Sequence, residues 1–113
     1  MTPTALARHL TLPAAVNRSS GEVVPLSYTL DHPADVVSTD SLTQAQKIAL
    51  IRARWLAGEW SDIVYDHMGL IDRDRALREL EAQSDIGRHL MAVELRAIEM
   101  ARQDAAVAKG EQR

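Results

Sequence analysis

The chain has 113 residues, the length of one small domain, with 13 Lys and Arg against 16 Asp and Glu. Because it contains no Cys, a disulfide scaffold and cysteine-based metal or redox chemistry are excluded. The slightly acidic charge balance disfavours a polybasic nucleic-acid or membrane-surface protein, and the lack of any run of about 20 apolar residues predicts no transmembrane helix. We therefore expect a small cytoplasmic protein.

The N-terminal segment, residues 1–40, differs in composition from the rest of the chain. It holds all four prolines, Pro3, Pro13, Pro25 and Pro33. Because proline lacks an N–H and clashes inside a helix, this segment is predicted to be an extended arm. Residues 22–30 (EVVPLSYTL) end in an alternation of apolar and polar positions, which predicts a short edge strand. A lone strand is unstable in water, so the arm is expected to lie on the helices or on another chain.

Residues 41–113 contain no proline and hold most of the Ala, Leu, Arg and Glu, so they predict a helical domain. Ser41 or Thr43 caps the first helix, because each is followed after three residues by a Gln in capping-box spacing. Gly58 is expected to end this helix.

Three further helices are predicted from their capping residues. Ser61 begins a short helix that Gly69 ends, and Asp72 begins the next one. Ser84 then precedes a long fourth helix over residues 85–109. The predicted fold class is thus mainly α: a small bundle of about four helices, the last one long, behind an extended N-terminal arm.

Apolar side chains cover more than half of the surface of the predicted fourth helix, whereas a surface helix needs a stripe of only about 100°. This helix is therefore either central to its own domain or packed on a second chain. The lean core expected of about 70 helical residues without Phe favours association with another chain. The residues of this helix that are predicted to contact a partner are Ile86, Leu90, Val93, Leu95 and Ile98.

Trp55, Trp60 and Tyr65 are the most distinctive aromatic cluster of the chain. Trp60 and Tyr65 have the spacing of a hydrophobic staple around Ser61, which favours a corner of the small core. The alternative is a partner-binding hot spot, since Trp and Tyr are enriched at such sites. Trp55 and Trp60 are therefore included as secondary partner-binding residues.

The sequence contains no pattern of residues that carries catalysis or binds a metal. None of the four His residues lies three or four positions from another, so no helical metal-binding pair is present. The acids between Asp72 and Glu81 alternate with Arg residues, which is typical of a salt-bridged exposed face. There is also no nucleophile motif and no phosphate-binding loop. We expect no catalytic residue, no metal and no cofactor.

A helix-turn-helix is an alternative interpretation of residues 56–80, which predict helix, Gly, short helix, Gly and helix. The residues that would contact DNA are Arg73, Arg75 and Arg78. However, the bulky Tyr65 stands where the motif has a small residue. The acids of the last helix also leave it almost neutral, although phosphate contacts supply most non-specific affinity. Nucleic acid is therefore less favoured than protein as a partner.

One segment resembles a known group of proteins. Its motifs, in residues 32–55, are His32-Pro33-Ala34-Asp35-Val36-Val37, Leu42-Thr43, Lys47, Ala49-Leu50 and Trp55. This order is similar to that of small uncharacterised bacterial proteins in which an HPxDV segment leads into a helix with a Lys-x-Ala-Leu core and a Trp. The resemblance covers about a fifth of the chain, and because the group has no assigned activity it implies no functional residues. The predominance of Arg over Lys fits a bacterial or phage genome.

Taken together, these patterns predict a non-catalytic protein-protein interaction protein, namely a small helical subunit or adaptor of a homo- or hetero-oligomeric assembly. Two alternatives stay open. One is a DNA-binding regulator of the helix-turn-helix type, and the other is an accessory subunit of an enzyme complex.

Overall fold

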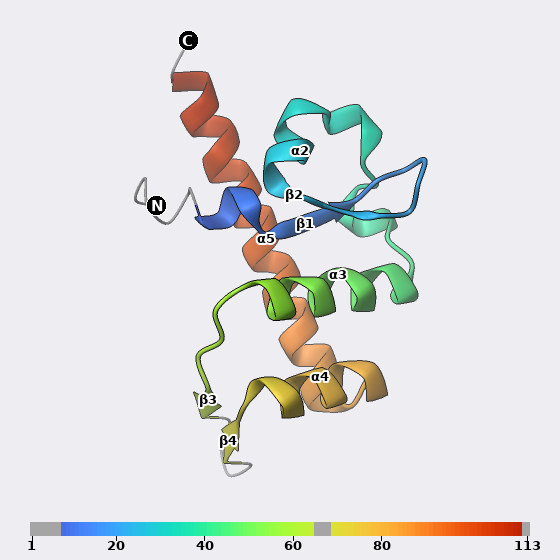
Figure 1. The fold of residues 1–113 in the computed structure, drawn as a ribbon, viewed down its shortest axis with the longest axis vertical. Coiled ribbons are helices and arrows are strands. Elements are labelled where there is room, and N and C mark those ends of the chain that lie inside the picture. The colour runs from blue at the N-terminus through green and yellow to red at the C-terminus, as the bar shows by residue number, and fades with distance from the viewer. Residues whose placement is uncertain (1–7, 65–68, 112–113) are drawn as a thin grey trace.

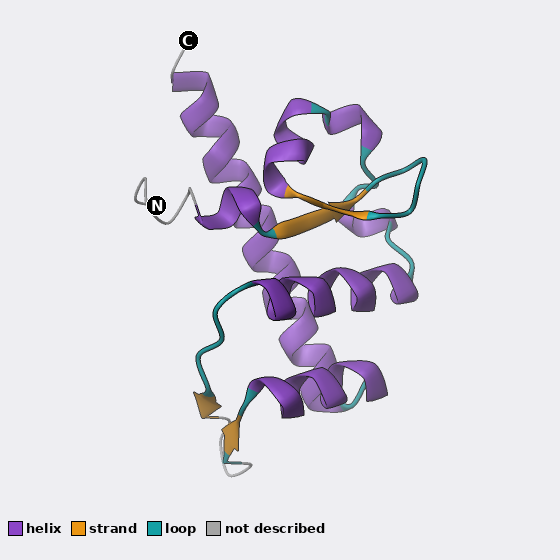
Figure 2. Ribbon diagram, in the orientation of Figure 1, coloured by secondary structure: helices purple, strands orange, loops and turns teal. Residues whose placement is uncertain are grey.

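The structure of the chain, a computed structural model, describes residues 8–64 and 69–111 and is mainly helical (Figures 1 and 2). Its longest element is α5 (Asp85–Glu111), which runs along the longest dimension of the molecule. Two other helices, α3 (Gln44–Ala57) and α4 (Arg73–Ala82), pack against it. The mainly α fold and the long C-terminal helix confirm those two parts of the predicted fold class.

The N-terminal part forms a hairpin, a short helix and two turns. β1 (Pro13–Val16) pairs antiparallel with β2 (Val23–Pro25), and α2 (Leu26–Asp31) follows β2 directly. Two short 3-10 helices, η1 (Pro33–Asp35) and η2 (Thr39–Ser41), then lead to α3.

The strand predicted over residues 22–30 is wrong beyond Pro25, where α2 begins. Pro25 has no N–H with which to continue a strand ladder, and it keeps an extended backbone, with φ −74° and ψ 164°, as the residue directly before the first turn of α2. Leu26 and Leu30 fit a strand as alternate apolar positions, but residues four apart also lie on one face of a helix. The apolar pattern alone therefore does not separate the two, and in the folded chain these residues form α2 with Leu26 buried in the core.

Residues 13–37 pack against the helices and do not extend from them as an arm. Val16 and Leu26 belong to the same buried cluster as the inner face of α3. The hairpin is also tied to the segment before α3, because Val37 N–H donates to the Val16 carbonyl at 2.9 Å. The described part of the predicted 1–40 arm is thus folded, since pairing and burial together stabilise strands that would be unstable alone.

The first long helix, α3, begins and ends at the predicted residues. Thr43 Oγ1 accepts from Gln46 N–H at 3.1 Å, and Thr43 N–H donates to Gln46 Oε1 at 2.8 Å, which completes the capping box. At the other end, Gly58 N–H donates to the Arg54 carbonyl at 2.9 Å. The reciprocal cap identifies Thr43, and not Ser41, as the start signal.

A second small hairpin lies between α3 and α4 (Figure 1). β3 (Ile63–Val64) pairs antiparallel with β4 (Leu70–Ile71). The short helix predicted over residues 61–69 is therefore wrong at its start, while residues 65–68 lie outside the described residues. Because strand side chains alternate between faces, the hairpin buries Ile71 completely, and this contact outweighs a weak local preference for helix.

The last two helices, α4 and α5, begin at the predicted capping residues. Asp72 Oδ1 accepts from Arg75 N–H at 2.8 Å, and Ser84 Oγ accepts from Gly87 N–H at 3.1 Å. Between the helices Gln83 has a φ of +52°, in the left-handed region that ends many helices. The chain can therefore reverse within two residues and pack α5 against α4.

The core lies where the N-terminal hairpin, α2, α3 and α4 meet α5. Its largest fully buried side chains are Leu26, Leu50, Ile51, Ile71, Leu80, Ile98 and Val16. These residues come from elements throughout the chain, so the described parts share one core. Among the described residues, no helix combines the length and the apolar character that crossing a membrane requires.

Candidate functional site

Four of the five α5 residues predicted to contact a partner belong to the core of this chain itself. Ile86, Leu90 and Ile98 are buried, and Leu95 packs against the same cluster. Val93 alone among the five is exposed. The inner arc of α5 is therefore covered by the chain's own elements, which leaves Ile86, Leu90 and Ile98 little exposed surface to offer a partner, while Leu95 stays partly exposed.

The two Trp residues also pack within the molecule. Trp55 is buried, and Trp60 lies edge-on against it, with ring centroids 5.5 Å apart and ring planes inclined by 74°. Edge-to-face packing is a favoured arrangement of aromatic rings. For Trp55, this packing supports a place in the core and not a partner-binding hot spot. Trp60 is only partly buried and borders a pocket.

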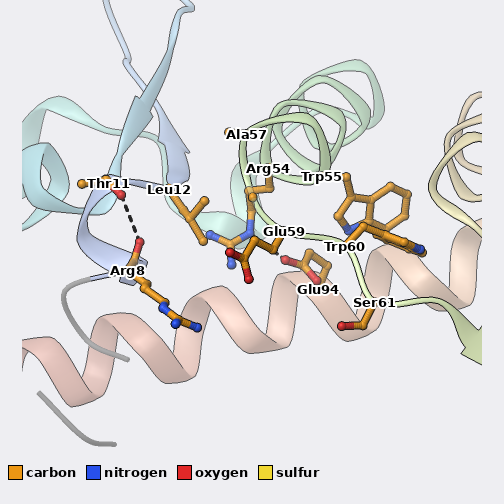
Figure 3. Close-up of a pocket in the computed structure, with 11 residues that line it drawn as sticks. Arg8, Thr11, Leu12, Arg54, Trp55, Ala57, Glu59, Trp60, Ser61 and Glu94 are labelled. Carbon is orange, nitrogen blue, oxygen red and sulfur yellow. Dashed lines mark hydrogen bonds and ion pairs between the residues drawn. The ribbon is translucent and has the colours of Figure 1, made fainter. Parts of the chain in front are cut away.

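The pocket beside these rings has a volume of about 530 Å³ and lies between residues 8–12, the end of α3 and α5 (Figure 3). Leu12, Trp55 and Trp60 contribute apolar surface, while Arg54 and Glu94 contribute charge. A volume of this size is typical of sites that hold a small molecule. The lining contains two Arg and two Glu residues, so its charges balance and select neither an anion nor a cation.

Arg54 and Glu94 form a buried ion pair in the wall of this pocket. Arg54 is only 5% exposed, its Nε donates to Glu94 Oε1 at 2.8 Å, and its Nη1 donates to the Pro13 carbonyl at 2.7 Å. These bonds join α3 to α5 and to β1, which indicates a structural role for the pair. Sequence reasoning missed it because the two residues are 40 positions apart and no local pattern links them.

A second charged cluster surrounds Glu99 on α5. This carboxylate accepts hydrogen bonds from Thr39 Oγ1 and from Arg102 Nη2, the latter at 2.6 Å. Burial by itself would raise the pKa of Glu99, but the two hydrogen bonds and the charge of Arg102 outweigh burial and hold the pKa below its ordinary value of 4.5. Glu99 is therefore ionised near neutral pH, where it ties η2 to α5 and is a poor proton donor.

The three Arg residues of the DNA-binding alternative lie in different surroundings. Arg73 Nη2 donates to the Gly58 carbonyl at 3.1 Å, and its buried Nε has no hydrogen-bond partner among the described residues. Arg75 is partly buried, and Arg78 is exposed. The helix that the motif requires before this one is replaced over residues 63–64 by strand β3. The described residues thus lack the geometry on which the helix-turn-helix hypothesis depended.

The outer face of α5 carries three exposed apolar side chains, Val93, Met100 and Val107, hereafter the α5 stripe. They are 52%, 58% and 61% exposed. Each lies seven residues from the next, so at 100° per residue all three fall within about 40° of one another. Met100 and Val107 were not among the predicted contact residues, because helical spacing does not show which part of a wide apolar arc faces inward.

Within residues 8–64 and 69–111, no group of three His, Asp or Glu side chains is placed to hold a metal ion. The α5 stripe, the pocket and the two charged clusters are therefore the features from which a function can be inferred. No family model, no curated protein and no solved structure matches the chain.

Proposed function

We propose that this protein is a non-catalytic interaction protein, a small helical subunit or adaptor that binds another polypeptide through the α5 stripe. The observation that carries the proposal is the exposure of Val93, Met100 and Val107 in one line. Fully burying an exposed Val or Met side chain contributes roughly 1.5–3 kcal/mol, and these three, at 52%, 58% and 61% exposed, have somewhat more than half of that still to gain in an interface. Three of them in a row provide a substantial driving force for association.

The spacing of the stripe favours a helix as the element that binds to it. Seven-residue intervals correspond to two helical turns and are the repeat with which helices pack side by side. At 1.5 Å per residue, the stretch from Val93 to Val107 extends over about 21 Å. Exposed polar side chains of Arg96, Gln103 and Asp104 border the stripe, as a polar rim borders the apolar centre of protein interfaces.

The two alternative functions differ in their support. An accessory role in an enzyme complex is one form of the proposed function and uses the same surface. DNA binding has less support, because Arg73 is engaged by the Gly58 carbonyl and the preceding segment, residues 63–64, is a strand.

The proposal is tested by comparing wild-type protein with Met100→Asp and with Ala106→Asp as the matched control. Both positions are exposed on α5, but at 100° per residue Ala106 points about 120° away from Met100. Tagged versions are purified from the native source, and circular dichroism verifies that each is folded. We expect a partner polypeptide to copurify in constant stoichiometry with the wild type and the control but not with Met100→Asp. Equal recovery of the partner by both variants would contradict the proposal.

A further inference from the structure

We infer that the polypeptide bound by the α5 stripe is a second copy of this chain, with its α5 antiparallel to the first. This inference rests on the proposed function and names its partner. Val93 and Val107 lie seven residues on either side of Met100. A two-fold axis at Met100 therefore places the two Met100 side chains against each other. It also places Val93 of each copy against Val107 of the partner subunit, so the stripe is complementary to itself.

The charges on α5 provide the second argument. Five of its charged residues have partners within the chain, because Arg88 pairs with Asp85, Arg102 with Glu99, and Glu94 with Arg54. Two exposed residues beside the stripe, Arg96 and Asp104, form no ion pair with any other described residue.

Arg96 and Asp104 cannot pair with each other inside one helix. They are eight residues apart, which is about 12 Å along the helix axis, whereas ion pairs on a helix join residues three or four apart. Each of them lies four residues from Met100. The antiparallel two-fold arrangement therefore brings Arg96 of each copy level with Asp104 of the partner subunit, twice in one dimer.

The same charges disfavour a parallel pair of α5 helices. In register, a parallel pair would set Arg96 beside Arg96 of the partner subunit and Asp104 beside Asp104 of the partner subunit, and like charges at an interface are repulsive. Arg96 and Asp104 lie about 40° on either side of Met100. The two-fold axis leaves Arg96 of one copy and Asp104 of the partner subunit level with each other but on opposite sides of the contact, and at a helix separation of 8–10 Å the long Arg side chain can reach across it. The arrangement is a closed two-fold dimer.

Engineered thiols test the orientation, and they are unambiguous because the natural chain has no Cys. Under mild oxidation, we expect Met100→Cys to form a disulfide-linked dimer. We expect Val93→Cys alone to stay unlinked, since position 93 of one copy and position 93 of the other lie about 21 Å apart along the antiparallel helices. A mixture of Val93→Cys and Val107→Cys is expected to give a dimer that contains one of each. Efficient linkage of Val93→Cys to itself would overturn the antiparallel arrangement.

Charge exchange tests the same geometry without a thiol. Light scattering of the wild type is expected to give the mass of a dimer, and Met100→Asp that of a monomer. Arg96→Glu and Asp104→Arg are each expected to weaken self-association by roughly tenfold, and the double variant to recover it, because two ion pairs across the contact are lost and then restored.

The two proposals fail in different ways. A wild-type chain that stays monomeric up to about 1 mM overturns self-association, yet the proposed function stands if a different polypeptide copurifies and is lost from Met100→Asp. The proposed function fails when Met100→Asp has the same mass as the wild type by light scattering and still copurifies with every partner of the wild type.

Discussion

Two Arg–Glu pairs of this chain differ in how much folding stability depends on them, because one pair is buried and the other is exposed. Arg54 pairs with Glu94 in the wall of a pocket, where the side chains are 4% and 26% exposed, whereas Arg52 pairs with Glu81 at the surface, at 48% and 56%. A buried guanidinium that loses its counter-charge cannot be compensated by water. The exposed pair is screened and solvated whether or not its partner is present.

Replacing Glu94 by Gln is therefore expected to lower the free energy of unfolding by about 3–5 kcal/mol. The matched control is Glu81→Gln, which is expected to cost less than about 1 kcal/mol because Arg52 stays in water. Urea unfolding of the three proteins measures both values. Small and equal losses would show that Arg54 is solvated in the folded protein.

Glu99 gives the protein a stability that depends on pH. Its pKa in the folded state lies below the ordinary value of 4.5, so the folded state favours the carboxylate. The corresponding stability is complete above pH 4.5 and is lost as the pH falls through the folded pKa of Glu99, because the unfolded chain binds the proton first.

We expect Glu99→Gln to lower the melting temperature at neutral pH by more than it does in acid, so that the two curves approach each other below pH 4.5. Thr39→Val removes one of the hydrogen bonds to the carboxylate, and NMR titration should then show a higher pKa for Glu99 than in the wild type. A difference between wild type and Glu99→Gln that is constant with pH would refute the role of this carboxylate.

One residue at the start of α5, Gly87, lets the backbones of α4 and α5 approach each other closely. A Cβ atom at Gly87 would lie 2.0 Å from the carbonyl oxygen of Glu79 and 2.4 Å from its carbonyl carbon. The backbone of α4 occupies that space and cannot move aside as a flexible side chain would. Glycine is therefore required at this crossing although it is unfavourable within a helix.

Substitution of Gly87 by Ala is expected to cost about 3 kcal/mol or more, since the helices must separate to admit one methyl group. Gly110→Ala is the control within the same helix, because nothing lies within 4 Å of its added Cβ. This control should be unchanged or more stable by up to about 1 kcal/mol. Thermal unfolding followed by circular dichroism compares them, and similar melting temperatures for the two variants would argue against the close crossing.

At the scale of the whole molecule, the N-terminal hairpin and α2 are part of the same core as the helices. Leu26 and Val16 are almost completely buried in one cluster with side chains of α3, α4 and α5. Folded domains are only marginally stable, so the loss of one large buried side chain removes a large share of the free energy of unfolding. We therefore expect the N-terminal elements and the helices to unfold together.

Leu26→Ala is predicted to lower the free energy of unfolding of the whole chain by about 2–5 kcal/mol. Circular dichroism, which reports the helices, and Trp fluorescence should give coincident transitions. Leu56→Ala is the control, because Leu56 is about half exposed and its loss should cost under about 1 kcal/mol. Helices that melt unchanged in Leu26→Ala would mean that the N-terminal segment folds independently of them.

Local signals in the sequence were enough to place α3, α4 and α5, because capping residues such as Thr43, Asp72 and Ser84 act on the backbone within one turn. They failed where distant contacts decide the outcome. Leu26 and Leu30 fit either a strand or a helix until the core is known, and the residues after Ser61 form a strand because Ile71 is buried in the assembled fold.

The sequence by itself determined that this protein is mainly helical, that it lacks thiol chemistry, and that its last helix is apolar over more than half of its surface. The tertiary structure alone decided which part of that surface is covered. Ile86, Leu90 and Ile98 turned inward while Val93, Met100 and Val107 stayed exposed. The physical reason is that helical periodicity specifies the angles between side chains on one helix, whereas the packing of the other helices selects which of those angles faces the core.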